Sequence, residues 1–246
     1  MSSSTSSAAS NQQPSPGIWP SLAPYVTPPV AASAAIIPVF RDMVAKSSLQ
    51  RGHQAPSLTL MEGWKGGMKA APTVGAIVGA QMVFQNFVEK TLIGDSNAET
   101  LSSALASSAI VGTASAPVLA IFNGQTMGWT VRESLRKFSA RQGIAIAVQE
   151  TAFVGGLSIA DKLSIEMKRK FGNNKAVDYT AAFVAGAAGS LAGHPANTAL
   201  TRWQSGMRVD SLHQLMWGSI RKARAVGGFA AFYKFGKEAL NSMADS

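Results

Sequence analysis

The chain has 246 residues, of which only 14% are charged, and it carries a formal net charge of +9. Its apolar residues are mostly small or aliphatic, which favours a helical bundle in a membrane over a soluble domain. It has no cysteine, which excludes disulfides, cysteine-ligated zinc and thiol nucleophiles. The HExxH, GxxxxGK[ST], GxSxG and GxGxxG motifs are also absent, so we expect no enzymatic activity, no cofactor and no metal.

The amino-terminal region predicts a disordered tail over residues 1–25. It begins with MSSSTSSAASNQQPSPG, a tract too polar to form a core, and the first forty residues carry no charged side chain. A mitochondrial presequence would be rich in arginine, and a secretory signal would begin with basic residues. Neither pattern is present, so we expect any targeting information to lie inside the chain.

Six segments of helical character follow the tail. They span roughly 26–46, 68–92, 98–126, 143–170, 175–204 and 213–242. Small residues recur at four-residue spacing, as in Gly75/Gly79 and Gly189/Gly193, which lets helix backbones approach closely within a bilayer. Such pairs also arise by chance in helices rich in alanine and glycine.

Basic residues gather in and near the connections that follow the first, third and fifth segments. They are Arg41, Lys46, Arg51, Lys65, Lys69, Arg132, Arg136, Lys137, Arg141, Arg202, Arg208, Arg221, Lys222 and Arg224. The positive-inside rule places this face in the bacterial cytoplasm or the mitochondrial matrix, with both termini on the opposite side. No block of consecutive basic residues supports a nucleic-acid partner, so we expect none.

Three prolines mark an internal repeat. Pro38, Pro117 and Pro195 each lie in the second half of an odd-numbered segment, 79 and then 78 residues apart. Because a proline inside a helix removes a backbone hydrogen bond, equal spacing indicates kinks that bend each odd helix inward. We therefore expect three helix pairs, at 26–92, 98–170 and 175–242.

Sequence motifs around these prolines resemble the mitochondrial carrier family. AGSLAGHPANTALTRWQ is similar to the family signature Pro-x-acid-x-x-base-x-basic-x-Gln, with Pro195, Arg202 and Gln204 in matching positions. EGWKGGMKAAP, RQGIAIAVQETAF and ARAVGGFAAF resemble the stretches that open the family's even-numbered helices. The resemblance implies an all-α membrane protein with six transmembrane helices in three pseudo-threefold repeats. It also implies a mitochondrial inner-membrane location with both termini toward the intermembrane space.

The charged gates of the family are degenerate in this chain. The resemblance places the matrix gate at Phe40, Met43, Leu119, Phe122, Asn197 and Leu200, where no acid–base pair remains. On the opposite gate only Asp161 keeps a charge. An apolar plug in place of ion pairs suggests a carrier fold that no longer alternates between two closures.

Three further residues occupy what resembles the family's substrate-contact level: Lys69, Gln149 and Arg224. Two cations facing one cavity would favour a small anion. Alternatively, Lys69 and Arg224 lie at the basic interface and contact lipid phosphates, those of cardiolipin among them.

These patterns lead to one preferred function and two alternatives. We expect a non-transporting structural or accessory subunit of a respiratory or ATP-synthesising assembly, whose partners are membrane lipids and other inner-membrane subunits. The first alternative is an active exchanger of nucleotides, phosphate or carboxylates. The second is a soluble helical protein, which carbonate extraction would release from membranes.

Overall fold

The computed structural model describes residues 19–88, 91 and 101–244. Within these ranges the side chains at 19–21, 24, 82–87, 101–104, 154–164 and 244 are outside the description. The described part is helical and contains no strand, which confirms the all-α prediction. Most of the predicted tail lies outside the described residues, but the first helix begins at Trp19, so residues 19–25 are helical.

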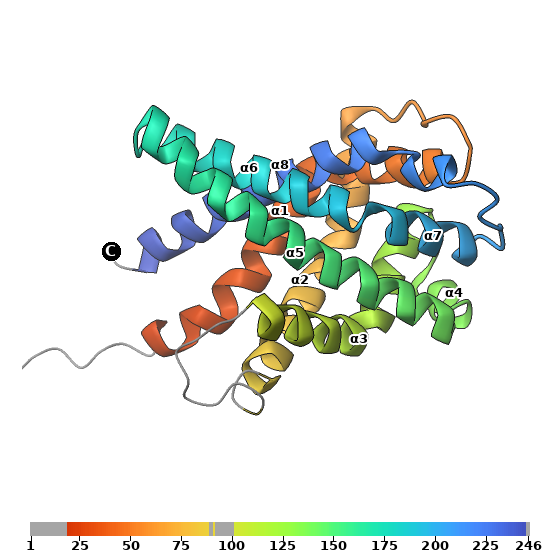
Figure 1. Cartoon of the computed structure of the whole chain (residues 1–246), viewed down its shortest axis with the longest axis horizontal. Helices are drawn as coiled ribbons and strands as arrows, with labels where there is room; N and C mark the ends of the chain where they lie inside the picture. The colour runs from red at the N-terminus through yellow and green to blue at the C-terminus, as the bar shows by residue number, and fades with distance from the viewer. Residues whose placement is uncertain (1–18, 89–90, 92–100, 245–246) are drawn as a thin grey trace, which may run out of the picture.

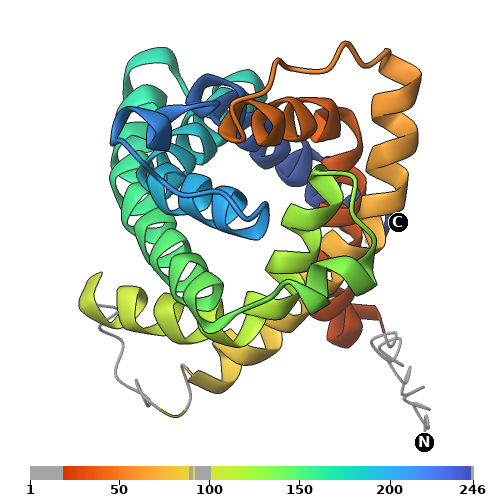
Figure 2. The ribbon, with the colours of Figure 1, turned by 90° about the vertical axis from the view of Figure 1, so that its right-hand side faces the viewer.

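Six long helices of the described part form a closed ring. They are α1 (Trp19–Gln50), α2 (Leu60–Val88), α3 (Leu101–Thr126), α5 (Ala140–Phe171), α6 (Lys175–Ala192) and α8 (Ser219–Ala244). Each packs against the next one along the chain, and α8 packs back against α1. Figure 1 shows the helices from the side, and Figure 2 shows the ring from one end. The six segments expected from the sequence correspond to these helices.

The fifth predicted segment is two helices rather than one. The helix α6 ends at Ala192, and α7 (His194–Gln204) begins after Gly193 with Pro195 in its first turn. A proline is favourable there because the first amides of a helix have no partner within it. The other two prolines differ, since α1 and α3 continue through Pro38 and Pro117.

The connections at one end of the ring contain short helical elements, the first of which the sequence did not predict and the second of which lies within the sixth predicted segment. They are α4 (Val131–Arg136) and a 3₁₀ turn, η2 (His213–Met216). At the start of α4, Thr130 and Glu133 exchange side-chain and backbone hydrogen bonds, which satisfy amides at the helix start. The Thr130 amide and hydroxyl bonds hold the pKa of Glu133 below its usual range. Thr59 and Glu62 make the same exchange where α2 begins.

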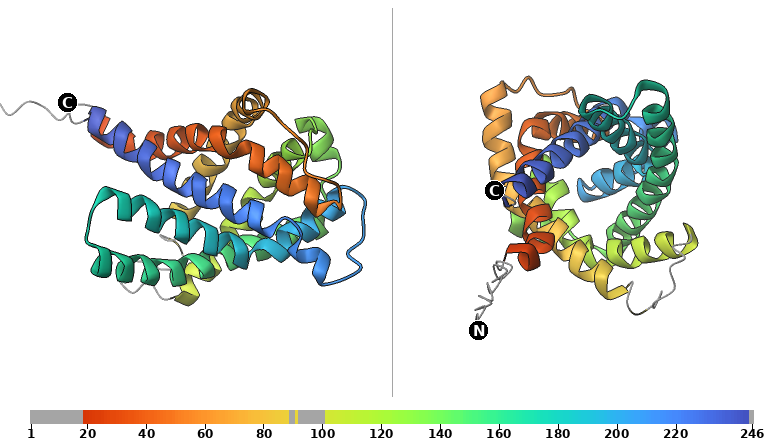
Figure 3. Two further views of the ribbon diagram at one scale, coloured as in Figure 1. Left: turned by 90° about the horizontal axis from the view of Figure 1, so that it is seen from above. Right: turned by 90° about the vertical axis from the view of Figure 1, so that its left-hand side faces the viewer.

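The opposite end of the ring holds the start of α1 and the end of α8, which lie near each other in Figure 3. The turn between α5 and α6 lies at this end as well. The carboxy-terminal ends of α1, α3 and α7 therefore all point to the end that carries the short connections.

Close helix packing explains several of the small residues. A Cβ on Gly193 would lie 2.6 Å from the Gln149 carbonyl oxygen, and one on Gly189 would lie 3.0 Å from the Phe153 carbonyl oxygen. By contrast, a Cβ on Gly79 would meet only Pro29, at 3.6 Å. The Gly189/Gly193 pair thus lets α6 approach α5, as expected of small residues at this spacing.

Two described helices are long and apolar enough to cross a membrane: Tyr25–Gln50 within α1 and Leu105–Thr126 within α3. The other ring helices also expose large apolar side chains. Examples are Ile144 and Val148 on α5, Phe183 and Leu191 on α6, and Phe232 and Phe235 on α8.

Candidate functional site

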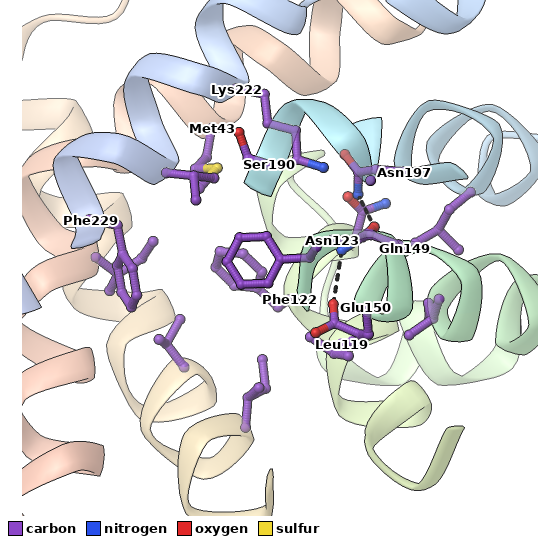
Figure 4. A pocket seen from close by; sticks show the side chains of 18 of the residues that line it. Met43, Leu119, Phe122, Asn123, Gln149, Glu150, Ser190, Asn197, Lys222 and Phe229 are labelled. Carbon is purple, nitrogen blue, oxygen red and sulfur yellow. Dashed lines mark hydrogen bonds between the residues drawn. The ribbon is translucent and has the colours of Figure 1, made fainter. Parts of the chain in front are cut away.

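A cavity of about 220 Å³ lies inside the ring and is lined by all six ring helices and by α7. Most of its wall is apolar, with Met43, Leu119, Phe122 and Phe229 among the larger side chains (Figure 4). Polar and charged side chains project into it as well. They are Lys46, Gln81, Asn123, Gln149, Glu150, Ser190, Asn197 and Lys222.

One end of the cavity is closed by a hydrogen-bonded group of side chains, which we term the closing layer. It joins the carboxy-terminal halves of α1 and α3 to α7, and every member is buried. Its members are Lys46, Ser47, Gln50, Asn123, Thr126, Asn197, Thr198, Thr201 and Gln204.

Lys46 is the only charged member of the closing layer. Its ammonium donates to Asn197 Oδ1 at 3.0 Å and to Asn123 Oδ1 at 3.4 Å, which links α1 to both other helices. Since a buried cation without acceptors would be costly, these two amide oxygens are what allows Lys46 to lie there. Asn197 also donates to Gln149 Oε1 at 2.8 Å and so connects the layer to α5.

Amides and hydroxyls complete the layer. Gln50 Nε2 donates to Thr198 Oγ1 at 2.8 Å, and Gln50 Oε1 accepts from the Thr201 hydroxyl at 2.8 Å. Asn123 Nδ2 donates to Gln204 Oε1 at 2.5 Å. Ser47 and Thr126, which are 79 residues apart, share a hydrogen bond of 2.6 Å. Buried polar groups of this kind are stable only when they are paired, and the layer pairs them across three helices.

Arg202 fixes the loop that follows α7. Its Nε donates to the Arg208 carbonyl oxygen at 2.8 Å, and one terminal nitrogen donates to the Gln50 carbonyl oxygen at 3.2 Å. The guanidinium also lies 5.7 Å from the centre of the Trp217 ring. Arg202 therefore holds the end of α1 and the 205–218 loop against α7.

Two side chains of opposite charge enter the cavity beyond the closing layer. Figure 4 shows Lys222 entering from α8 and Glu150 from α5, on different sides of the pocket. Gln149 Nε2 donates to Glu150 Oε1 at 3.1 Å, whereas Lys222 Nζ has no hydrogen bond or ion pair among the described residues. The residue is 6% exposed, so its ammonium is enclosed with the cavity.

The gate positions expected from the sequence have a different arrangement. Asn197 is in the closing layer, while Met43, Leu119, Phe122 and Leu200 line the cavity beside it. Phe40 instead packs in the core cluster formed with α2. The closure on α1 consists of Lys46, Ser47 and Gln50, so it is polar and not the apolar plug that the sequence predicted. Retained motif residues Arg202 and Gln204 both bond to neighbouring helices.

Only one of the three expected contact residues lies at the cavity. Gln149 lines it, but Lys69 and Arg224 are exposed on the outside of the ring. Arg224 makes a bidentate contact with Asp42 at 2.6 and 2.7 Å, and Arg221 contacts the same carboxylate. The expectation that Lys69 and Arg224 face one cavity is corrected accordingly. Asp161 lies in α5, and its side chain is outside the described residues.

Lys69 borders a second hollow of about 640 Å³, between the end of α1, the start of α2 and the α3–α4 connection. Arg51 and Trp129 also line it. The acid Glu62 lines it too, so the hollow carries two cations, one carboxylate and an aromatic ring at the basic end of the ring.

A scan against protein-family models finds no family that matches the chain, and no curated protein shows significant similarity to it. Function is therefore inferred from the geometry of the ring, the closing layer and the cavity.

Proposed function

We propose that the protein is a divergent, carrier-like protein of the mitochondrial inner membrane that exchanges a small charged solute through its central cavity. The closed ring, the two apolar helices and the exposed apolar side chains support a bundle that crosses the membrane, and we propose that it does so with six helices. The positive-inside rule places its basic end in the matrix and both termini toward the intermembrane space. Its lipid partners include cardiolipin, whose phosphates contact the two cations of the hollow, Lys69 and Arg51.

The single observation that carries this proposal is the buried Lys222 side chain, which lies at a cavity and makes no hydrogen bond or ion pair with the described residues. An ionisable group at such a position is costly, and its usual explanation is function. A cavity of about 220 Å³ is smaller than the roughly 300–1,000 Å³ of sites for drug-sized ligands, which favours a small metabolite over a nucleotide.

The nature of the closing layer favours transport over a purely structural role. Amides, hydroxyls and one ammonium can exchange their mutual hydrogen bonds for bonds to water when the helices separate. An apolar plug has no such replacement, so a polar layer lowers the cost of opening and permits two conformations of similar free energy.

An accessory subunit is the second candidate, and one observation favours it. The start of α2 exposes four large apolar side chains, those of Leu60, Met61, Trp64 and Met68. A patch of this kind at the basic end of the ring suits another inner-membrane subunit of a respiratory or ATP-synthesising complex.

Exchange of radiolabelled solutes by purified protein in liposomes tests the proposal. We expect counter-exchange of at least one small charged metabolite, reduced at least about ten-fold by Lys222→Met because a charge-assisted contact is lost. The control is Lys175→Met, which removes an equal charge from the exposed start of α6 and should leave exchange unchanged. A silent protein that co-purifies stoichiometrically with a respiratory complex would instead establish the accessory subunit.

A further inference from the structure

Three helices contribute charged side chains to the cavity. These side chains differ in how many hydrogen bonds they make. Lys46 of α1 is bonded to two amide oxygens of the closing layer. Glu150 of α5 has one amide donor, and Lys222 of α8 has no bonded partner among the described residues. No other charged side chain lines the described part of the cavity. One cation and one anion are thus left to contact whatever enters.

Glu150 and Lys222 lie on different sides of the pocket, and their charges interact across it without direct contact. They form no ion pair in the described structure, although both project into the same cavity (Figure 4). Glu150 is also held in position: Gln149 donates to it at 3.1 Å, and its stem packs on Gly112 of α3, where an added Cβ would lie only 2.8 Å from Glu150 Cβ. The stem of Glu150 is therefore confined against α3, and Gln149 orients its carboxylate.

Most of the remaining wall is apolar. Met43, Leu119, Phe122, Phe153 and Phe229 come from four different helices and surround the space near the two charges. A ligand that fits this lining has a carboxylate for Lys222, an ammonium for Glu150 and an apolar group for the wall.

We propose that the cavity binds a small α-amino acid with an apolar side chain, an inference that depends on the proposed solute exchange and specifies its substrate class. The ligand carboxylate accepts from Lys222, and the ligand ammonium donates to Glu150. A simple anion of the same size offers Glu150 no donor beyond Gln149 and places a second negative charge in the same site, so Glu150 selects against it.

Three ligands with the same isobutyl group test this assignment: L-leucine, 4-methylpentanoate, which lacks the amino group, and 3-methylbutylamine, which lacks the carboxylate. Binding is measured as thermal stabilisation of the full chain in mild detergent. We expect leucine to bind at least about ten-fold more tightly than either analogue, since each analogue loses one charge-assisted contact. Equal binding of leucine and 4-methylpentanoate would overturn the assignment without any variant.

The variant Glu150→Gln, which conserves the shape of the side chain, tests whether Glu150 causes the preference for leucine over 4-methylpentanoate. It should weaken the binding of leucine at least about ten-fold and bring the affinity for leucine close to that for 4-methylpentanoate. Lys222→Met should instead weaken the binding of both leucine and 4-methylpentanoate, because both carry a carboxylate. An unchanged preference in Glu150→Gln contradicts the role of Glu150.

Exchange assays with labelled leucine, phosphate and malonate separate this inference from the proposed function. If phosphate or malonate exchanges and leucine does not, the substrate class is wrong and solute exchange stands. If none of the three exchanges and none of the ligands binds, both proposals fail.

Discussion

Replacing Asn197 with leucine is expected to lower the free energy of unfolding by about 3 kcal/mol or more. The substitution removes the acceptor that lies 3.0 Å from Lys46 Nζ and 3.1 Å from Gln50 Nε2, together with the donor to Gln149. It leaves the buried Lys46 ammonium with only the longer bond to Asn123. Thermal unfolding in mild detergent should show a decrease of at least about 6 °C in Tm.

Asn197→Asp is the matched variant for this effect. A carboxylate keeps an acceptor for both Lys46 and Gln50 and also neutralises the ammonium, so we expect a much smaller loss of stability. If the leucine and aspartate variants unfold at the same temperature, the closing layer does not depend on the Asn197 oxygen.

Arg202→Met is expected to have a similar effect, of roughly 3 kcal/mol, at the same end of the ring. It removes two charge-assisted hydrogen bonds to the Arg208 and Gln50 carbonyl oxygens and leaves both acceptors to find other donors. Proteolysis should then cut the 205–218 loop faster, because the guanidinium no longer holds it to α7.

Arg208→Met is the control, since its side chain is exposed and the residue meets Arg202 only through its backbone oxygen. It removes the same charge and should change neither Tm nor the rate of cleavage. Equal effects of the two variants would assign the loss to net charge rather than to the Arg202 contacts.

The helical architecture could be predicted from the sequence, because the signals for it are local and repeated. Residues 98–126 were expected as one segment, and α3 spans Leu101–Thr126. Recurrent small residues and three prolines at nearly equal spacing indicated three helix pairs, and the described part closes them into one ring. The short helix α4 was missed because only Thr130 and Glu133 mark its start.

On α1 the sequence predicted the closure at Phe40 and Met43, whereas the closing layer contains Lys46, Ser47 and Gln50. The difference arises because positions in α1 and α7 were aligned by counting from their prolines. Pro38 precedes Gln50 by 12 residues, whereas Pro195 precedes Gln204 by 9, and this difference of three is almost one helical turn. The four-residue spacing from Lys46 to Gln50 equals that from Leu200 to Gln204. Alignment on the glutamines would therefore have placed Lys46 and Gln50 at the layer.

Which cations face the cavity could not be decided from spacing alone. Arg224 follows Lys222 by two residues, which is about 200° around a helix, so one points inward when the other points outward. The choice depends on how α8 is rotated against α1, where Asp42 pairs with Arg221 and Arg224. This contact spans about 180 residues of sequence and leaves no local pattern.

The central claim is a ring that faces lipid outside and an aqueous cavity inside, and labelling of single cysteines tests it most directly. The chain has no cysteine of its own, so each introduced thiol is the only one present. Val226→Cys lies at the cavity, and Val148→Cys lies on the outer face of α5, where valine is 53% exposed. In liposomes, a membrane-impermeant thiol reagent should label the cysteine at 226 and leave the one at 148 unlabelled. Rapid labelling at 148 with none at 226 would contradict the account and indicate a soluble helical bundle.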